Sequence, residues 1–198
     1  MKKLAVLLSL APALALAAPS HWNIDASHSQ VGFAVKHLVI SNVRGEFGAY
    51  QGKLFLDEAD VTKSTVNATI DVNSLNTKVA DRDTHLKSAD FFDVAKYPTM
   101  TYKSTKVEKA GKDRLKVTGD LTLHGVTKPV VLDVSTSAEV KGMYGETRRA
   151  FAATTKIDRK DYGLTWNKLV EAGPAVGDEV AITLDLELVK DQPKSASN

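Results

Sequence analysis

The sequence predicts an all-β protein whose antiparallel strands close into a barrel. Apolar and polar residues alternate with a period of two along most of the chain, as they do in half-buried strands. The alternating segments follow one another with short connections, which favours antiparallel pairing. Few segments have a helical pattern that could cover the apolar face of such a sheet. The sheet must therefore close on itself or pair with a second sheet, and a two-sheet sandwich is the competing architecture.

Eight segments carry the alternating pattern. The clearest is the last, in which Val180, Ile182, Leu184, Leu186 and Leu188 alternate with mostly polar residues. Eight long strands with one apolar face favour a closed barrel, and a barrel of this size can hold one small ligand. The predicted strands are residues 31–36, 45–57, 66–73, 99–103, 116–123, 130–134, 151–157 and 180–189.

Two segments break the alternation. Residues 81–88 are predicted to form a short helix, in which Asp81 can cap the N-terminus and Asp83 precedes Lys87 by four residues, the favourable order for an ion pair. Residues 157–177 form a long connection that contains Trp166. Long structured connections on a barrel often form lids or rims, so a rim loop is predicted here.

The two ends of the chain are expected to lie outside the fold. Residues 1–17 are predicted to be a cleaved secretory signal peptide, because Lys2 and Lys3 precede an apolar run that ends in a small-x-small site. This prediction places the protein in the periplasm. Residues 18–190 are predicted to form a single domain, and the polar segment 191–198 is predicted to be disordered.

The charge balance argues against two classes of partner. The chain has 26 basic and 24 acidic residues, and removal of Lys2 and Lys3 would leave equal numbers of each. The predicted mature protein therefore has no excess of positive charge. The basic excess of the full chain is therefore no evidence for binding to nucleic acid or to anionic membranes. No nucleic acid partner and no stable membrane insertion are expected.

The sequence contains little that suggests catalysis or metal binding. The five histidines lack the i, i+4 spacing of a zinc-binding helix, and cysteine is absent. No G-x-S-x-G nucleophile motif occurs. The acidic residues near His85 are interleaved with basic ones, which suits capping and local ion pairs better than acid–base work. No catalytic residue, metal or cofactor is predicted, although His28, His37, His85 and His124 could converge in space.

An unusual concentration of aromatic residues suggests a lined cavity. Phe91, Phe92, Tyr97 and Tyr102 fall within twelve residues, between the predicted helix and a predicted strand. Apolar residues of the other strands would face the same enclosed space, where they either line a cavity or pack against one another. The candidates are Phe33, Phe47, Ile70, Phe91, Phe92, Met100, Tyr102, Leu121, Phe151 and Leu184.

Several ordered motifs resemble those of the YceI-like family, periplasmic lipocalin-like proteins that bind polyisoprenoid lipids. The resemblance covers almost the whole predicted mature chain and is far more specific than any single motif. The motifs are HSxVGF at residues 28–33, VKHL at 35–38, VRGxF at 43–47, RDxHLKSxDFFD at 82–93, YPxMTYxST at 97–105, GDLTLHGVTKP at 119–129 and IDRxDYGL at 157–164.

The resemblance implies an eight-stranded antiparallel lipocalin-like barrel with an internal tunnel that holds an isoprenoid chain. It implies no catalysis and no metal, and it makes a homodimer an expectation. The predicted ligand-binding set consists of Val35, Trp166 and the ten cavity candidates named before the motifs. Since the chain of such a lipid is chemically uniform, selectivity would come from tunnel length and a polar mouth, for which His37, Arg44 and His85 are the candidates.

The predicted function is therefore that of a periplasmic lipid-binding protein. It would hold a polyisoprenoid, such as a quinone or a polyprenyl lipid, or a similar amphiphile, for transport, storage or sequestration. Two alternatives remain open from the sequence. One is a lipid-modifying enzyme that uses His85 with Asp83 or Asp93, and the other is a stress-related structural protein with a packed barrel.

Overall fold

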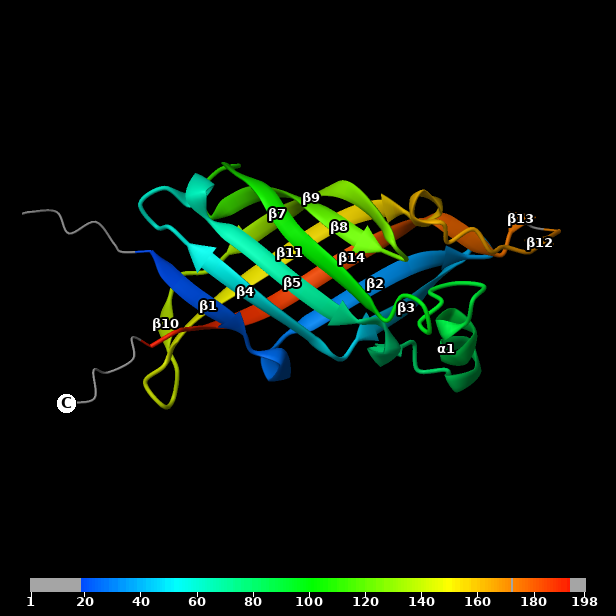
Figure 1. The fold of residues 1–198 in the computed structure, drawn as a ribbon, viewed down its shortest axis with the longest axis horizontal. Helices are drawn as coiled ribbons and strands as arrows, with labels where there is room; N and C mark the ends of the chain where they lie inside the picture. The colour runs from blue at the N-terminus through cyan, green and yellow to red at the C-terminus, as the bar shows by residue number, and fades with distance from the viewer. Residues whose placement is uncertain (1–18, 172, 193–198) are drawn as a thin grey trace, which may run out of the picture.

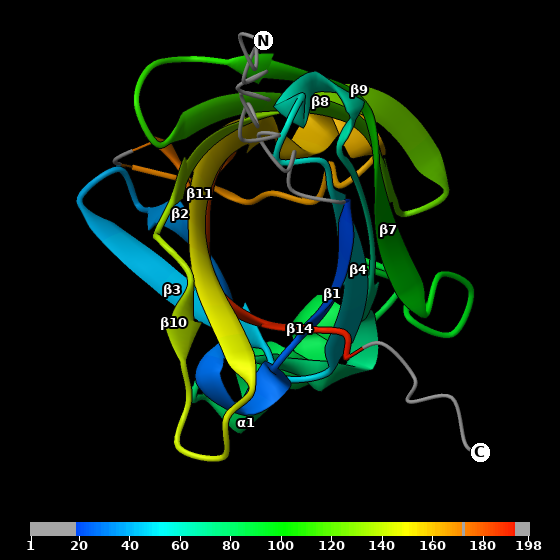
Figure 2. The same ribbon diagram turned by 90° about the vertical axis from the view of Figure 1, so that its left-hand side faces the viewer.

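The protein folds into a closed antiparallel β-barrel, as the sequence predicts (Figure 1). The computed structural model describes residues 19–171 and 173–192. The predicted signal peptide and most of the predicted tail lie outside these described residues. Figure 2 looks along the barrel from the end that carries β10, and the strands surround one central axis.

Eight strands form the closed ring, and every neighbouring pair is antiparallel. The first and last of them close it through a pairing between Trp22 and Lys190. In pairing order the strands are β1 (Ser20–Ile24), β4 (Tyr50–Leu56), β5 (Thr65–Asp71), β7 (Thr99–Lys109), β8 (Arg114–Leu123), β9 (Val126–Thr136), β11 (Thr147–Asp158) and β14 (Val176–Lys190).

One end of the barrel is extended by three further strands, β2 (Gln30–His37), β3 (Ser41–Phe47) and β6 (Leu75–Asn76). β1 and β2 pair with the same edge of β14, at residues 188–190 and 176–185 respectively. The 3-10 turn η1 (Ala26–His28) separates them. β14 is therefore long enough to pair with both β1 and β2 along one edge.

The sequence-based strand assignments need two corrections. Residues 45–57 are not one strand, because β3 ends at Phe47 and β4 begins at Tyr50. The strand β1 was not predicted, since its sequence SHWNI contains polar residues on both faces and gives a weak alternating signal. The ring still has eight strands, because β2 and β3 lie outside it while β1 and β4 belong to it.

The remaining elements lie at the two ends of the barrel. The short helix α1 (Ala80–Lys87) and the hairpin β12–β13 lie at one end, and β10 lies at the other (Figure 1). No helix among the described residues is long and apolar enough to cross a membrane. The short elements are β10 (Val140–Lys141), β12 (Leu169–Val170), β13 (Gly173–Pro174), η2 (Val61–Lys63), η3 (Val72–Ser74) and η4 (Arg159–Tyr162).

The helix was predicted to within one residue, but its stabilising contacts differ from the prediction. Val79 occupies the cap position, without a side-chain cap, so Asp81 does not cap the helix. Asp83 accepts hydrogen bonds from the backbone nitrogen and the hydroxyl of Thr77, at 2.8 and 2.5 Å. Its carboxylate thus accepts hydrogen bonds from the preceding loop and does not pair with Lys87.

A bulge in β7 decides which side chains of that strand face the interior. The pairing of β7 with β8 shifts between Ser104 and Lys106, which leaves Thr105 as an extra residue. An extra residue breaks the period of two, so Tyr102 and Val107 are both buried in the core although five positions separate them.

Candidate functional site

The interior of the barrel is hollow. Ile182 and Leu184 on β14 are only partly buried, although β11 and β2 flank them on the two sides. Their free surface faces an internal cavity of about 270 Å³, to which all eight strands of the ring contribute. An apolar cavity of about 150 Å³ is enough to bind benzene, so this one has room for a larger apolar group. The cavity contradicts the packed-barrel alternative.

The lining of this cavity is almost entirely apolar. Among the described residues, every buried side-chain nitrogen and oxygen has a hydrogen-bond partner. An interior without free polar groups favours hydrocarbon over water. The cavity is therefore suited to hold an apolar chain.

Tyr102 supplies the main polar atom inside the barrel, and that atom is already bonded. Its hydroxyl donates to the main-chain oxygens of Val117 and Val130, at 2.8 and 3.4 Å. Burial raises the pKa of Tyr102 above its ordinary value, and the nearby charge of Asp120 raises it further. The phenol is thus neutral and held in place in the cavity wall.

Trp22 fills the core at the end of the barrel near β10. Its side chain is fully buried behind the wall residues Leu56 and Leu188. The indole nitrogen donates to the hydroxyl of Ser20 at 2.9 Å, and the ammonium of Lys190 lies 5.2 Å from the ring centroid. These contacts satisfy the polar edge of the indole, so its apolar body can fill the core there.

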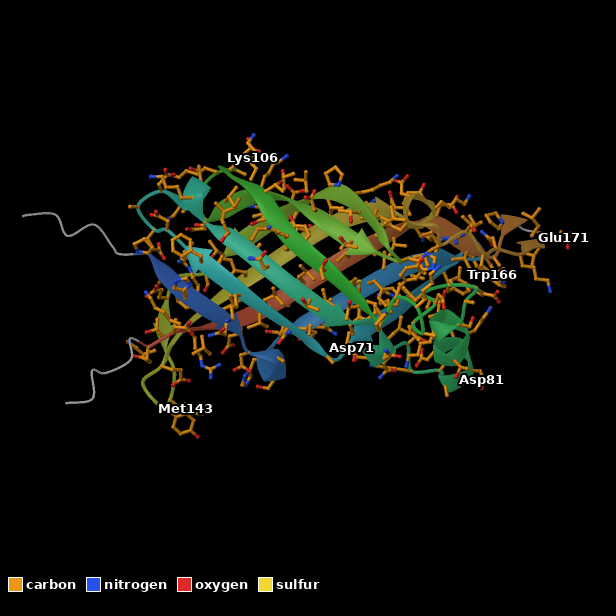
Figure 3. The ribbon with its side chains drawn as sticks, viewed as in Figure 1. Asp71, Asp81, Lys106, Met143, Trp166 and Glu171 are labelled. Atoms are coloured by element: carbon orange, nitrogen blue, oxygen red, sulfur yellow. The ribbon has the colours of Figure 1, made fainter. Side chains whose placement is uncertain are left out.

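At the opposite end, three aromatic side chains from two segments meet. The ring of Trp166 lies 5.0 Å from that of Phe91 and 4.9 Å from that of His85, and the rings of His85 and Phe91 are 5.1 Å apart. Phe91 is part of the cavity wall. This cluster joins the segment after α1 to the rim loop, and Figure 3 shows Trp166 at the α1 end of the molecule.

Arg159 holds the rim loop against the barrel. Its guanidinium is almost completely buried, and it donates to the main-chain oxygens of Trp166 and Leu164 on one side of the loop. On the other side it donates to the oxygen of Gly177 at 2.9 Å and to the carboxylate of Asp178 at 3.2 Å. One cation therefore ties together both ends of the segment that carries Trp166.

The sequence contains a signal for this role. Arg159 lies in the motif IDRxDYGL, two residues after a predicted strand that ends at Ile157. An arginine next to buried positions such as Tyr162 and Leu164 needs several acceptors, and the main-chain oxygens of an irregular loop can supply them.

Most of the predicted lining residues are found in the cavity wall. Trp166 is the exception, since it does not belong to the wall but packs against the wall residue Phe91. For the residues on strands, alternation explains the placement, because it puts every second side chain on the inner face. The wall contains Phe33, Val35, Phe47, Ile70, Phe91, Phe92, Met100, Tyr102, Leu121, Phe151 and Leu184.

The three residues predicted for a polar mouth do not come together. Arg44 pairs with Ala34, which alternates with the wall residues Phe33 and Val35, so Arg44 lies on the outer face of β3. His37 is exposed at the end of β2. His85 packs in the aromatic cluster, and its Nε2 lies 3.0 Å from a carboxylate oxygen of Asp90.

Two other histidines also have hydrogen-bonding partners. Nδ1 of His124 lies 3.0 Å from the main-chain oxygen of Tyr162, and that of His28 lies 3.0 Å from the carboxylate of Asp25. Among the described residues, Asp25, His28 and Glu187 lie close enough to share a metal ion. Arg148 donates to both of these carboxylates, however, so the cluster is an ion-pair network that already contains its cation.

Comparisons of the sequence and of the structure with known proteins point to the same family. The model of the YceI-like domain matches residues 22–188. Protein YceI of Salmonella newport is 39% identical over 176 residues, which are 89% of each chain. The crystal structure of the Campylobacter jejuni YceI protein has a TM-score of 0.66 and 33% identity, covering 85% of this chain and 96% of its own. A polyisoprenoid binding domain from Saccharophagus degradans shares the fold, with a TM-score of 0.62 and 21% identity over 86% of this chain and 98% of its own.

Proposed function

Because this chain belongs to the YceI-like family, we propose that it binds a long apolar lipid, a polyisoprenoid, inside its barrel. The observation that carries this proposal is the apolar cavity of about 270 Å³ between the strands. The similarity in fold to the polyisoprenoid binding domain of Saccharophagus degradans supports the same ligand class.

The chemistry of the wall suits such a ligand. Each buried methylene group contributes about 0.8 kcal/mol, so a chain of several isoprene units has ample gross affinity without any polar contact. The loss of translational and internal freedom offsets part of this gain. We propose that the wall residues and Trp166 contact the chain, and that the head group stays at the aromatic end, because Trp22 fills the other.

The cellular role that we propose is transport, storage or sequestration of the lipid in the periplasm. The resemblance of residues 1–17 to a secretory signal peptide supports this location. A protein that shields an apolar chain from water would allow a membrane lipid to cross or remain in an aqueous compartment.

The geometry favours binding over the alternative of a lipid-modifying enzyme. That alternative paired His85 with Asp83 or Asp93, but His85 lies against Asp90 and Asp83 accepts hydrogen bonds from Thr77. A base and its orienting carboxylate aimed into the cavity would be needed for catalysis. We therefore propose no catalytic residue, cofactor or metal.

The test is to identify the lipid. Protein purified from the periplasm is extracted with organic solvent, and the extract is analysed by mass spectrometry. Empty protein is then titrated with isoprenoids of increasing chain length and, as a comparison, with straight-chain fatty acids. A protein that carries no lipid and takes up none of these chains would falsify the proposal.

A further inference from the structure

The loop between β2 and β3 combines two unusual properties. It consists of Leu38, Val39 and Ile40, and the nitrogen of Ile40 donates to the oxygen of His37 at 3.2 Å. Leu38 and Val39 have φ angles of 50° and 65°. Turn positions with positive φ normally hold glycine, asparagine or aspartate, and a β-branched residue there is a marked outlier. The loop is thus both strained and apolar.

This loop forms one surface with the neighbouring hairpin β12–β13. The nitrogen of Leu38 donates to the oxygen of Ala175 at 3.0 Å, and a Cβ placed on Gly173 would lie 3.7 Å from a methyl group of Val39. Four exposed apolar side chains gather on the two loops, and we call them the apolar tip. They are Val39 (58% exposed), Ile40 (82%), Leu169 (82%) and Val170 (39%).

The apolar tip projects from the molecule at the end that carries α1 and the aromatic cluster. Figure 1 shows β12 and β13 extending beyond the barrel next to the end of β2, and Figure 3 places Glu171 and Trp166 there. The base of the loop adjoins the cavity wall, because the wall residue Val176 pairs with His37 there. The end of the barrel filled by Trp22 faces the other way.

Strain and exposure together need a compensating interaction. Single exposed apolar residues are ordinary, but four on adjacent projecting loops form a patch of the kind that marks an interaction site. Apolar side chains that face water do not offset the free-energy cost of the strained backbone. Backbone outliers of this kind concentrate at functional positions.

We propose that the apolar tip docks reversibly on the surface of a lipid bilayer. This inference rests on the proposed function, since a polyisoprenoid ligand resides in bilayers. A convex tip of four side chains fits between lipid head groups, whereas a second copy of the chain would need a broad, self-complementary face. Docking would bring the aromatic end of the barrel, rather than the end filled by Trp22, to the membrane.

The charges around the tip indicate which force dominates. Lys36 and Lys168 are exposed beside it and can approach lipid phosphates, while Glu171 on the same hairpin opposes anionic lipids. Electrostatic attraction is therefore weak, and insertion of the apolar side chains carries the binding. Such binding depends little on salt, unlike that of a basic surface.

The experiment measures flotation of the protein purified from the periplasm with vesicles of phosphatidylethanolamine and phosphatidylglycerol. The double variant Ile40→Asp/Leu169→Asp is compared with Met143→Asp, which changes an equally exposed residue on the loop at the opposite end. We expect the double variant to bind vesicles about tenfold more weakly or worse than the wild type. We expect vesicle binding to be nearly unchanged in Met143→Asp, and nearly unchanged for the wild type in 0.5 M salt. Thermal unfolding checks that all variants remain folded.

Equal flotation of the wild type and the double variant overturns the proposal, as does a wild-type protein that does not bind vesicles. A wild-type dimer in sedimentation experiments that becomes a monomer in the double variant, with no vesicle binding, would assign the tip to self-association instead. Titration with isoprenoid added from solution separates this result from the proposed function. Normal uptake without vesicle binding would refute the docking proposal and leave the proposed function intact. Vesicle binding without uptake would refute the proposed function and leave the docking proposal intact.

Discussion

Tyr102 lies directly over Gly119 on the neighbouring strand. A Cβ added to Gly119 would fall 2.5 Å from Cζ of Tyr102 and 2.7 Å from its hydroxyl oxygen. The absence of a side chain at this position lets the phenol reach the main-chain oxygen of Val117. The position of this polar side chain in the cavity wall therefore depends on a glycine on the neighbouring strand.

Substitution of this glycine should destabilise the barrel. Gly119→Ala would force Tyr102 away from its acceptors, and we expect the free energy of unfolding to fall by about 1–3 kcal/mol in urea denaturation. Gly48→Ala is the matched control, because the nearest atom to its new Cβ is 3.9 Å away. We expect that variant to lie within about 0.5 kcal/mol of the wild type. Equal effects of the two substitutions would contradict the role given to Gly119.

A bulky side chain in the cavity should block the ligand without preventing folding. Leu121 is a wall residue on β8, and Leu121→Trp would fill empty space. We expect lipid uptake to be lost while the stability falls by less than the roughly 1–3 kcal/mol of an overpacked core. Lys116→Trp, at an exposed position on the same strand, should bind lipid normally. Full uptake by Leu121→Trp would place the ligand elsewhere.

Removal of the Arg159 guanidinium should release the rim loop. In Arg159→Met, the main-chain oxygens of Leu164, Trp166 and Gly177 lose their buried donor. Each unsatisfied buried group costs about 1–3 kcal/mol, so we expect a loss of several kcal/mol in stability and faster proteolysis within residues 164–178.

The neighbouring lysine provides the comparison for this variant. Lys160 forms an exposed ion pair with Asp178 at 2.8 Å, and Lys160→Met should cost no more than about 1 kcal/mol. Arg159→Lys keeps the charge but not the planar set of donors, so it should resemble Arg159→Met. Recovery of full stability in Arg159→Lys would show that charge alone is sufficient.

The network around Asp25 predicts how stability depends on pH. Hydrogen bonds from Ser27, then from His28 and Arg148, hold the pKa of Asp25 well below its usual value. A carboxyl with a depressed pKa in the folded state stabilises the protein fully above its unfolded pKa of about 4. That contribution is lost as the pH falls below about 4 toward the folded pKa.

Asp25→Asn should therefore be less stable than the wild type at pH 7, and the difference should shrink as the pH falls below about 4. The measurement is urea denaturation at a series of pH values. A double-mutant cycle with Arg148→Met tests the assigned partner, because the two substitutions should not be additive. A difference between the variant and the wild type that stays constant down to pH 2 would exclude the linkage.

Trp166 should report ligand binding by its fluorescence. Its ring contacts the wall residue Phe91. The other tryptophan of the chain, Trp22, is buried with Leu56 and Leu188 at the opposite end of the barrel. We expect lipid to change the emission of the wild type and of Trp22→Phe. Trp166→Phe should still bind lipid, as measured by extraction, but lose most of this change. A response that persists in Trp166→Phe would indicate that the ligand reaches Trp22.

Much of the barrel interior could be predicted from the sequence alone. Alternation in a strand is a local property, so the positions of Phe33, Ile70, Leu121 and Leu184 on one face follow from their own neighbours. The short helix and the rim loop were also visible, since they interrupt a regular pattern. The resemblance in motifs then indicated that these segments form one closed barrel.

The tertiary structure decided the features that depend on pairing between distant segments. Trp22 fills the core because β1 joins β4 to β14, Arg44 turns outward because of its register with Ala34, and Arg159 finds acceptors up to 19 residues later. A local pattern contains no information about which strands become neighbours or where a bulge shifts their register. The sequence by itself thus determined what faces inward, and only the closed barrel determined where the cavity ends.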